Sequence, residues 1–369
     1  MYKSIYVAAT SQHVGKTTST LGLVAAFMKK GVKVGYCKPV GQKSLYLNSM
    51  EVDKDAILFA DLMKFKLDAD VHSPVILGKG ATAAFIDHPE NYAYPEKIKH
   101  AAEQLDINNE LVIYEGTGHP GVGSIVDLSN ADVAQMINAG VIMVVEGGIG
   151  STIDMLSLCL AKFQLLNIPI IGVIINKVKP AKIDKVSTYV GKYLETLGLP
   201  LLGIIPYDKS LAFPLMKTVA KAINGIVSFN EDQLDNKVED ILAGSLIDLG
   251  ELKSSKDLLL VVSAQRVDDA IEKIHSISNL VGLDKSPLSG IVATGHGSIG
   301  GDCLDYIKEH KIPVVRTSLD TYGSVLKISR IEVKINRSTP WKVARAIELI
   351  EKNVDMDALL EQVKIKDRV

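Results

Sequence analysis

The sequence predicts an α/β protein with a mostly parallel sheet in a three-layer arrangement, followed by a smaller three-layer α/β domain. Short runs rich in Val and Ile alternate with longer amphipathic stretches, as expected for strands buried on both faces with helices between them. This rhythm restarts after about residue 210. A chain of 369 residues is also longer than one ordinary domain. We therefore expect two domains, 1–210 and 211–369.

The first domain is expected to contain six strands joined by helices. The strands are expected at 4–9, 33–38, 111–115, 141–145, 170–175 and 201–205. The helical patterns lie at about 16–30, 54–64, 95–106, 131–138, 153–166 and 181–197. Ser129 and Asp132 have the spacing of a capping box and predict the start of the fourth helix.

The second domain begins with a segment that we expect to be rich in helix, after a boundary near 207–213 where turn residues cluster. Strands are expected next at 258–263, 289–294 and 312–317, with helices at 267–281 and 301–310. The final segment, about 340–364, is expected to be helical, with Pro340 in its first turn.

Composition limits the function classes. Apolar residues make up 47% of the chain and charged residues 23%, and the formal net charge of −2 gives no reason to expect a nucleic-acid partner. The three cysteines are far apart, which argues against a zinc site and suits a reducing compartment. Apolar runs are shorter than a membrane span, and no signal-peptide pattern opens the chain. We expect a cytoplasmic protein without a membrane partner.

Residues 7–20, VAATSQHVGKTTST, have the form of a phosphate-binding loop between a strand and a helix. Backbone N–H groups of such a loop and the N-terminus of the helix bind phosphate oxygens. Lys16 would reach the β- and γ-phosphates, and the Thr17 hydroxyl would bind Mg²⁺. A Gly-Lys-Thr that merely opens a helix is common, but its place after the first strand favours a nucleotide site. The usual first glycine is Thr10, which is tolerable if the loop is one residue longer.

Polar residues at the carboxyl ends of other strands extend this site. Lys38 follows the second strand and could neutralise a carboxylate or carbamate beside the γ-phosphate; alternatively it is a surface lysine before a turn. Glu115 ends the third strand and suits Mg²⁺, although a strand-end acid facing water is the simpler alternative. ATP and Mg²⁺ are therefore the expected ligands.

The order of these motifs resembles dethiobiotin synthetase over about residues 1–208. The shared segments are the loop from Thr10 to Thr17, Lys-Pro-Val at 38–40, Glu-Gly-Thr-Gly at 115–118, Asn-Lys-Val at 176–178 and Ile-Pro at 205–206. Ser11 stands where partitioning ATPases carry a lysine, which argues against that group.

The resemblance implies a role for each matching residue. Lys16 and Lys38 are the implied catalytic residues, and Thr17, Asp55 and Glu115 the implied metal ligands, with Asp53 as the alternative to Asp55. The implied nucleotide-binding residues are Gln12, His13, Val14, Gly15, Lys16, Thr17, Thr18, Asn176, Ile205 and Pro206. The implied substrate-binding residues are Thr10, Lys38, Gln42, Gly118 and Gly148. It also implies a homodimer.

Two departures leave two functions open. Gln42 replaces the serine that contacts the diamine in dethiobiotin synthetase, and the second domain is an addition. Residues 211–330 resemble a DRTGG domain, with Ala264–Asp268 in place of its Ala-Asp-Arg-Thr-Asp and Thr294–Gly297 in place of its Thr-Gly-Gly. This combination resembles the N-terminal half of long phosphotransacetylases. The chain is thus expected to be an ATPase or ATP-dependent ligase acting on a small carboxylate or amine, or instead a nucleotide-responsive regulatory module.

Overall fold

The computed structural model describes residues 1–244, 256–280, 282–283, 285–331 and 333–363. The chain forms two compact units, Met1–Asp208 together with the segment from Ile335, and Lys209–Lys334. No helix in the described ranges is both long and apolar enough to cross a membrane.

The first unit is built on a parallel six-stranded sheet. Its strands are β1 (Ser4–Ala9), β2 (Val34–Cys37), β7 (Leu111–Glu115), β8 (Gly140–Glu146), β9 (Ile170–Val178) and β10 (Leu201–Pro206). Their order is β10-β9-β8-β1-β7-β2, so β1 is central and pairs with β7 and β8. The predicted α/β fold class is confirmed. Because all six strands run in one direction, their carboxyl ends share one edge of the sheet.

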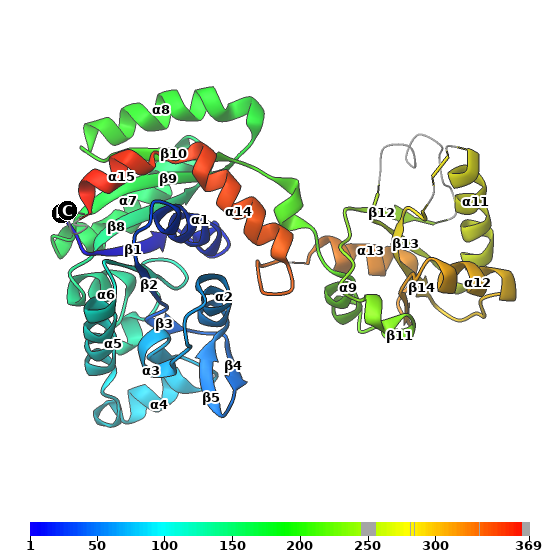
Figure 1. The fold of residues 1–369 in the computed structure, drawn as a ribbon, viewed down its shortest axis with the longest axis horizontal. Helices are drawn as coiled ribbons and strands as arrows, with labels where there is room; N and C mark the ends of the chain where they lie inside the picture. The colour runs from blue at the N-terminus through cyan, green and yellow to red at the C-terminus, as the bar shows by residue number, and fades with distance from the viewer. Residues whose placement is uncertain (245–255, 281, 284, 332, 364–369) are drawn as a thin grey trace. The chain divides into compact units, whose positions relative to one another are not determined.

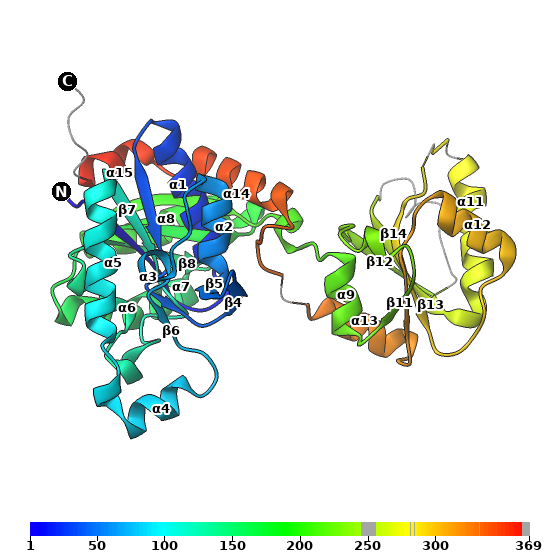
Figure 2. The same ribbon diagram turned by 60° about the horizontal axis from the view of Figure 1, so that its bottom comes forward.

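Helices cover both faces of this sheet (Figures 1 and 2). The helices of the first unit's α/β alternation are α1 (Lys16–Lys29), α2 (Lys54–Met63), α5 (Tyr94–Asn108), α6 (Asn130–Met136), α7 (Gly150–Leu165) and α8 (Ile183–Thr196). Buried apolar side chains of α5, α6, α7 and α8 pack in one cluster with alternate residues of the strands. The capping box of Ser129 and Asp132 at α6 is present as predicted.

The connection between β2 and α5 contains small elements that the sequence did not predict. They are β3 (Val40–Gly41), the hairpin of β4 (Ser44–Leu47) and β5 (Met50–Asp53), α3 (Ala69–His72), β6 (Val75–Ile76) and α4 (Ala81–Asp87). The hairpin carries the chain from the Lys38 segment to the start of α2. It therefore fixes where the acids at the start of α2 lie.

The assignment of 211–369 to the second domain is wrong for the C-terminal helices. These helices, α14 (Pro340–Asn353) and α15 (Met356–Gln362), belong to the first unit. In Figure 1 they lie beside α1 and β10. A Cβ atom on Gly22 would lie 2.1 Å from Cγ1 of Ile350, so glycine permits α1 and α14 to approach closely. Asp355 N donates to Leu202 O at 2.7 Å. These contacts are tertiary, so local sequence pattern could not reveal them.

The second unit has a five-stranded sheet of order β11-β15-β14-β13-β12. Its strands are β11 (Ile226–Phe229), β12 (Asp240–Ala243), β13 (Leu258–Ser263), β14 (Leu288–Thr294) and β15 (Val314–Thr317), with only β11 antiparallel to its neighbour. Helices α11 (Val267–Leu280) and α12 (Gly301–Glu309) contribute to one core cluster, and α9 (Met216–Ala222) and α13 (Thr321–Ser329) to the other.

The sequence predicted the three strands β13, β14 and β15, but it missed two others. The segment after Pro206 was expected to be rich in helix, whereas its described part holds α9 and the strands β11 and β12. The predicted helices 267–281 and 340–364 end at positions 281 and 364, and these two positions lie outside the described residues.

Candidate functional site

The loop after β1 has the backbone of a phosphate-binding loop. Gly15 caps α1 with φ 105° and ψ 32°, a left-handed conformation that favours glycine. A Cβ atom there would lie only 2.0 Å from Nδ2 of Asn176. Position 15 therefore requires glycine for two independent reasons. Thr10, which replaces the usual first glycine, has no positive φ and continues the β1–β8 pairing by donating from its backbone N to Val144 O at 3.1 Å, so its backbone conformation does not require glycine.

Asn176, predicted to contact the adenine, links this loop to β9 by a hydrogen bond. Its Nδ2 donates to Val14 O at 2.7 Å, and its Oδ1 accepts from Lys177 N at 2.8 Å. The side chain is buried. Asn176 thus has a structural role that the sequence did not indicate, and its contact with the adenine stays a prediction.

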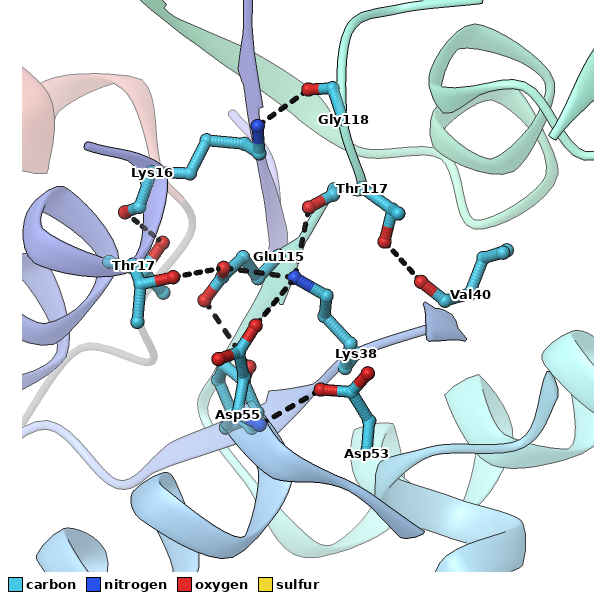
Figure 3. A network of polar contacts seen from close by, with 12 residues as sticks. Lys16, Thr17, Lys38, Val40, Asp53, Asp55, Glu115, Thr117 and Gly118 are labelled. Atoms are coloured by element: carbon cyan, nitrogen blue, oxygen red, sulfur yellow. Dashed lines mark hydrogen bonds and ion pairs between the residues drawn. The ribbon is translucent and has the colours of Figure 1, made fainter. Parts of the chain in front are cut away.

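A cluster of charged and polar side chains lies beside the loop (Figure 3). We call Thr17, Lys38, Asp55 and Glu115 the Lys38 cluster. Nζ of Lys38 lies 3.0 Å from Asp55 Oδ2 and 3.0 Å from Glu115 Oε1. The Thr17 hydroxyl donates to the same Glu115 oxygen at 2.8 Å. Four side chains from α1, the end of β2, the start of α2 and the end of β7 therefore meet at one point.

Lys16 lies at the edge of this cluster. Its Nζ donates to Gly118 O at 2.5 Å, and a longer contact of 3.4 Å reaches Ser11 O. Both Lys16 and Lys38 are buried. The structure therefore brings together the two lysines that were predicted to be catalytic and the three predicted metal ligands.

Burial and charge act in opposite directions on Lys38. Desolvation lowers its pKa, but attraction to Glu115 and Asp55 outweighs this effect, and the net result is a pKa above the ordinary value. Lys38 is consequently a permanent cation at neutral pH.

The structure separates the two candidate acids at the start of α2. Asp55 contacts Lys38, whereas Asp53 caps the helix by accepting from Asp55 N at 2.8 Å. Burial and repulsion from Asp55 raise the pKa of Asp53 to about 6, against the opposing effects of Lys38 and the capping hydrogen bond. Of the two, Asp55 is therefore the acid that contacts Lys38.

Asn130 is a site residue that sequence reasoning missed. Its Oδ1 accepts from Tyr6 Oη at 2.9 Å and from Thr117 N at 3.1 Å. Its Nδ2 donates to the carbonyls of Thr117 at 3.0 Å and His119 at 2.8 Å. Asn130 thereby shapes the loop that presents Gly118 O to Lys16. The only signal in the sequence was its place inside the predicted capping box.

A pocket of about 320 Å³ opens at the carboxyl ends of β8, β9 and β10. Gly148, Lys177 and Tyr207 are among its lining residues. Ile205, predicted for the adenine site, is buried at the end of β10, and Pro206 beside it is half-buried. Of the other predicted residues, Gln12, His13 and Gln42 are exposed, Thr18 is half-buried and Thr10 is buried.

The Lys38 cluster has the chemistry of a magnesium site. Two carboxylates contact one cation, the Lys38 ammonium group, and the Thr17 hydroxyl hydrogen-bonds one of these carboxylates, that of Glu115. Mg²⁺ prefers such oxygen ligands and is usually shared with substrate phosphates. Thr17, Asp55 and Glu115 could therefore hold Mg²⁺.

A strand, a loop ending in Gly-Lys-Thr and a helix at the centre of a parallel sheet define a P-loop NTPase fold, a class of proteins that binds nucleotides. Residues 3–214 match the AAA_26 family, described as an AAA domain, and the chain belongs to this family.

Curated relatives match different lengths of the chain. A probable cobyric acid synthase of Methanocaldococcus jannaschii is 29% identical over 240 residues, which cover 58% of this chain and 47% of that protein. A phosphate acetyltransferase of Synechocystis is 22% identical over 390 residues, covering 99% of this chain and 52% of that protein. The chain spans about half the length of these relatives. Among solved structures, the MinD cell division protein of Aquifex aeolicus matches with 18% identity and a TM-score of 0.38, over 57% of this chain and 84% of that one.

Proposed function

We propose that the chain binds ATP with Mg²⁺ at residues 10–18 and transfers the γ-phosphoryl group to a carboxylate or carbamate of a small molecule. The observation that carries this proposal is the convergence of Lys16 and Lys38 on the loop 115–118, beside three oxygen-bearing side chains. A carboxylate acceptor is favoured because two buried cations can neutralise both an anionic acceptor and the phosphate that it attacks.

Each residue of the site has a defined role in this proposal. The N–H groups at the start of α1 bind phosphate oxygens, and Lys16 neutralises the charge that develops on the transferred group. Lys38 positions the acceptor carboxylate. Thr17, Asp55 and Glu115 would hold Mg²⁺, which when bound neutralises charge on the β- and γ-phosphates. The product would be an acyl phosphate and ADP, and attack by an amine would release phosphate.

The adenine of ATP and the acceptor would lie on opposite sides of the phosphate-binding loop, residues 10–18. The adenine would lie near Asn176, Ile205 and Pro206, where the 320 Å³ pocket opens nearby. The acceptor would lie near Thr10, Gly118 and Gln42. Dethiobiotin synthetase has a serine in place of Gln42, so an exposed amide here favours a different acceptor. Gly148 lines the pocket beside Lys177 rather than the Lys38 cluster, so its contact with a substrate stays a prediction.

Release of ADP tests this proposal. The purified chain would be incubated with ATP, Mg²⁺ and a panel of carboxylates, amines and bicarbonate, and the released ADP would be measured. We expect one acceptor to raise the ADP release rate by at least about tenfold over ATP alone, as required for a substrate-dependent transfer. The variant Lys16→Ala should release no ADP, either with ATP alone or with the acceptor. A rate that no acceptor changes would contradict the ligase proposal.

A second function is favoured by the extent of similarity to phosphate acetyltransferases. Four of these relatives align with 97–100% of the chain, whereas the cobyric acid synthase match covers 58%. The alignment with these relatives thus extends over both units of the chain. In this alternative, ATP binding to the first unit would change the contacts of the second unit with a partner protein.

Hydrogen exchange distinguishes the two functions. A regulatory module should bind ATP tightly without stimulated turnover, and ATP should change amide exchange in residues 209–331. Unchanged amide exchange in the second unit would argue against regulation.

A homodimer is proposed by resemblance only, and sedimentation of the purified chain tests it. A cytoplasmic location suits three buried cysteines that form no disulfide.

A further inference from the structure

The Lys38 ammonium group uses its full hydrogen-bonding capacity inside the cluster. It donates to Asp55 Oδ2 and Glu115 Oε1 at 3.0 Å each, and to Gly116 O at 3.1 Å. An ammonium group has three donors, and these three contacts use all of them. Lys38 is only 5% exposed. A phosphate or carboxylate can therefore bind Lys38 only after at least one of these contacts breaks.

The same carboxylate oxygens are the ones that a divalent cation would use. Mg²⁺ binds oxygen at about 2.0–2.1 Å in near-octahedral geometry. Glu115 Oε1 already accepts from both Lys38 Nζ and Thr17 Oγ1. An ammonium group 3.0 Å from both carboxylates would repel a divalent ion placed between them, because both cations would occupy one buried site. Lys38 and a divalent ion are therefore alternatives at this pair of acids.

Only the side chain of Lys38 has to move for this exchange. Its backbone N donates to His72 O at 2.9 Å, and β2 is paired with β7 up to Cys37. Lys16 contacts the same loop, 115–118, with its Nζ on Gly118 O. A triphosphate at the phosphate-binding loop would offer anionic oxygens to both lysines. It is therefore the ligand able to draw Lys38 away from the acids.

We propose that Lys38 is the resident counter-cation of Asp55 and Glu115, and that a divalent ion binds these acids only when a triphosphate displaces the lysine. This inference rests on the proposed ATP site and adds an order of binding to it. Nucleotide and metal enter together, and the same displacement moves Lys38 towards the acceptor. The acids are never left as an uncompensated buried pair, which would be costly.

Binding of Mn²⁺, measured by the electron paramagnetic resonance signal of the free ion, tests the proposal without any turnover. Without nucleotide, the wild type should bind no Mn²⁺ at this site at concentrations up to about 1 mM. The variant Lys38→Met should bind one Mn²⁺ per chain at least about tenfold more tightly, because the competing charge is gone. The double variant Lys38→Met with Glu115→Gln should lose this binding. Lys79→Met, which removes an exposed lysine, is the matched control and should behave as the wild type.

The outcomes separate this inference from the proposed function. Tight Mn²⁺ binding by the nucleotide-free wild type, lost in Glu115→Gln, would overturn the inference even if ATP binds. Failure of ATP to bind would overturn the proposed function, while the Mn²⁺ comparison without nucleotide still decides the role of Lys38. If Lys38→Met does not fold, as judged by circular dichroism, the wild-type titration alone remains decisive. Mn²⁺ bound at this site below about 1 mM without nucleotide would then refute the inference.

Discussion

Replacing Asp53 by Asn should make the first unit more stable at neutral pH. Asp53 is 3% exposed and lies beside Asp55, and its pKa rises from 3.8 to about 6 on folding. The folded chain therefore holds a proton on Asp53 that the unfolded chain has lost, in the window between these two values. Stability contributed by this group consequently falls as the pH rises through that window.

The size of the effect follows from the same shift. One pKa unit corresponds to about 1.4 kcal/mol, so the ionised Asp53 destabilises the fold by about 3 kcal/mol above pH 6. Asparagine can accept the same capping hydrogen bond from Asp55 N and carries no charge. The difference in unfolding free energy between Asp53→Asn and the wild type should rise by about 2 kcal/mol between pH 4 and pH 7, because part of the full effect is already present at pH 4.

The assay is urea unfolding in EDTA without nucleotide, followed by fluorescence. Trp341 is the single tryptophan and lies in the first unit, so its signal reports on that unit. Asp68→Asn is a matched control, since Asp68 caps α3 by the same type of hydrogen bond but is exposed. Its difference from the wild type should change less between pH 4 and pH 7 than that of Asp53→Asn, because its side chain is exposed. A difference for Asp53→Asn that does not rise with pH would refute the reasoning.

Three further predictions test the loop and the C-terminal helices. Lys16→Ala should weaken ATP·Mg²⁺ binding by at least about a hundredfold in calorimetry, since a buried charge–phosphate contact is lost; unchanged affinity would remove the loop from the nucleotide site. Gly15→Ala should destabilise the first unit by about 1–3 kcal/mol in urea unfolding, through its left-handed backbone and its clash with Asn176. Adding Asn176→Ala should recover part of that loss, and no recovery would show that the clash is unimportant. Ile350→Ala should cost the first unit about 2–5 kcal/mol in the same assay, because Ile350 is buried against Gly22; a negligible change would contradict the docking of α14 on α1.

Local sequence determined the parts of the site that lie within one strand, loop and helix. The phosphate-binding loop was predictable because Gly15, Lys16 and Thr17 are adjacent in the sequence and lie together at the turn from β1 into α1. Lys38 and Glu115 were predictable because parallel strands bring their carboxyl ends to one edge of the sheet, whatever the connections between them. The alternation of buried strands with helices likewise determined the α/β class.

The tertiary structure decided what depends on contacts between distant segments. The choice between Asp53 and Asp55 follows from the hairpin before α2, which turns one acid to cap the helix and the other to Lys38. Asn130 holds the loop 115–119 from a helix whose sequence shows only a cap. The C-terminal helices pack on the first unit, α14 on α1 and β10 and α15 on β9 and β10, because this buries their apolar side chains. The surface that receives them is formed by segments far apart in the sequence.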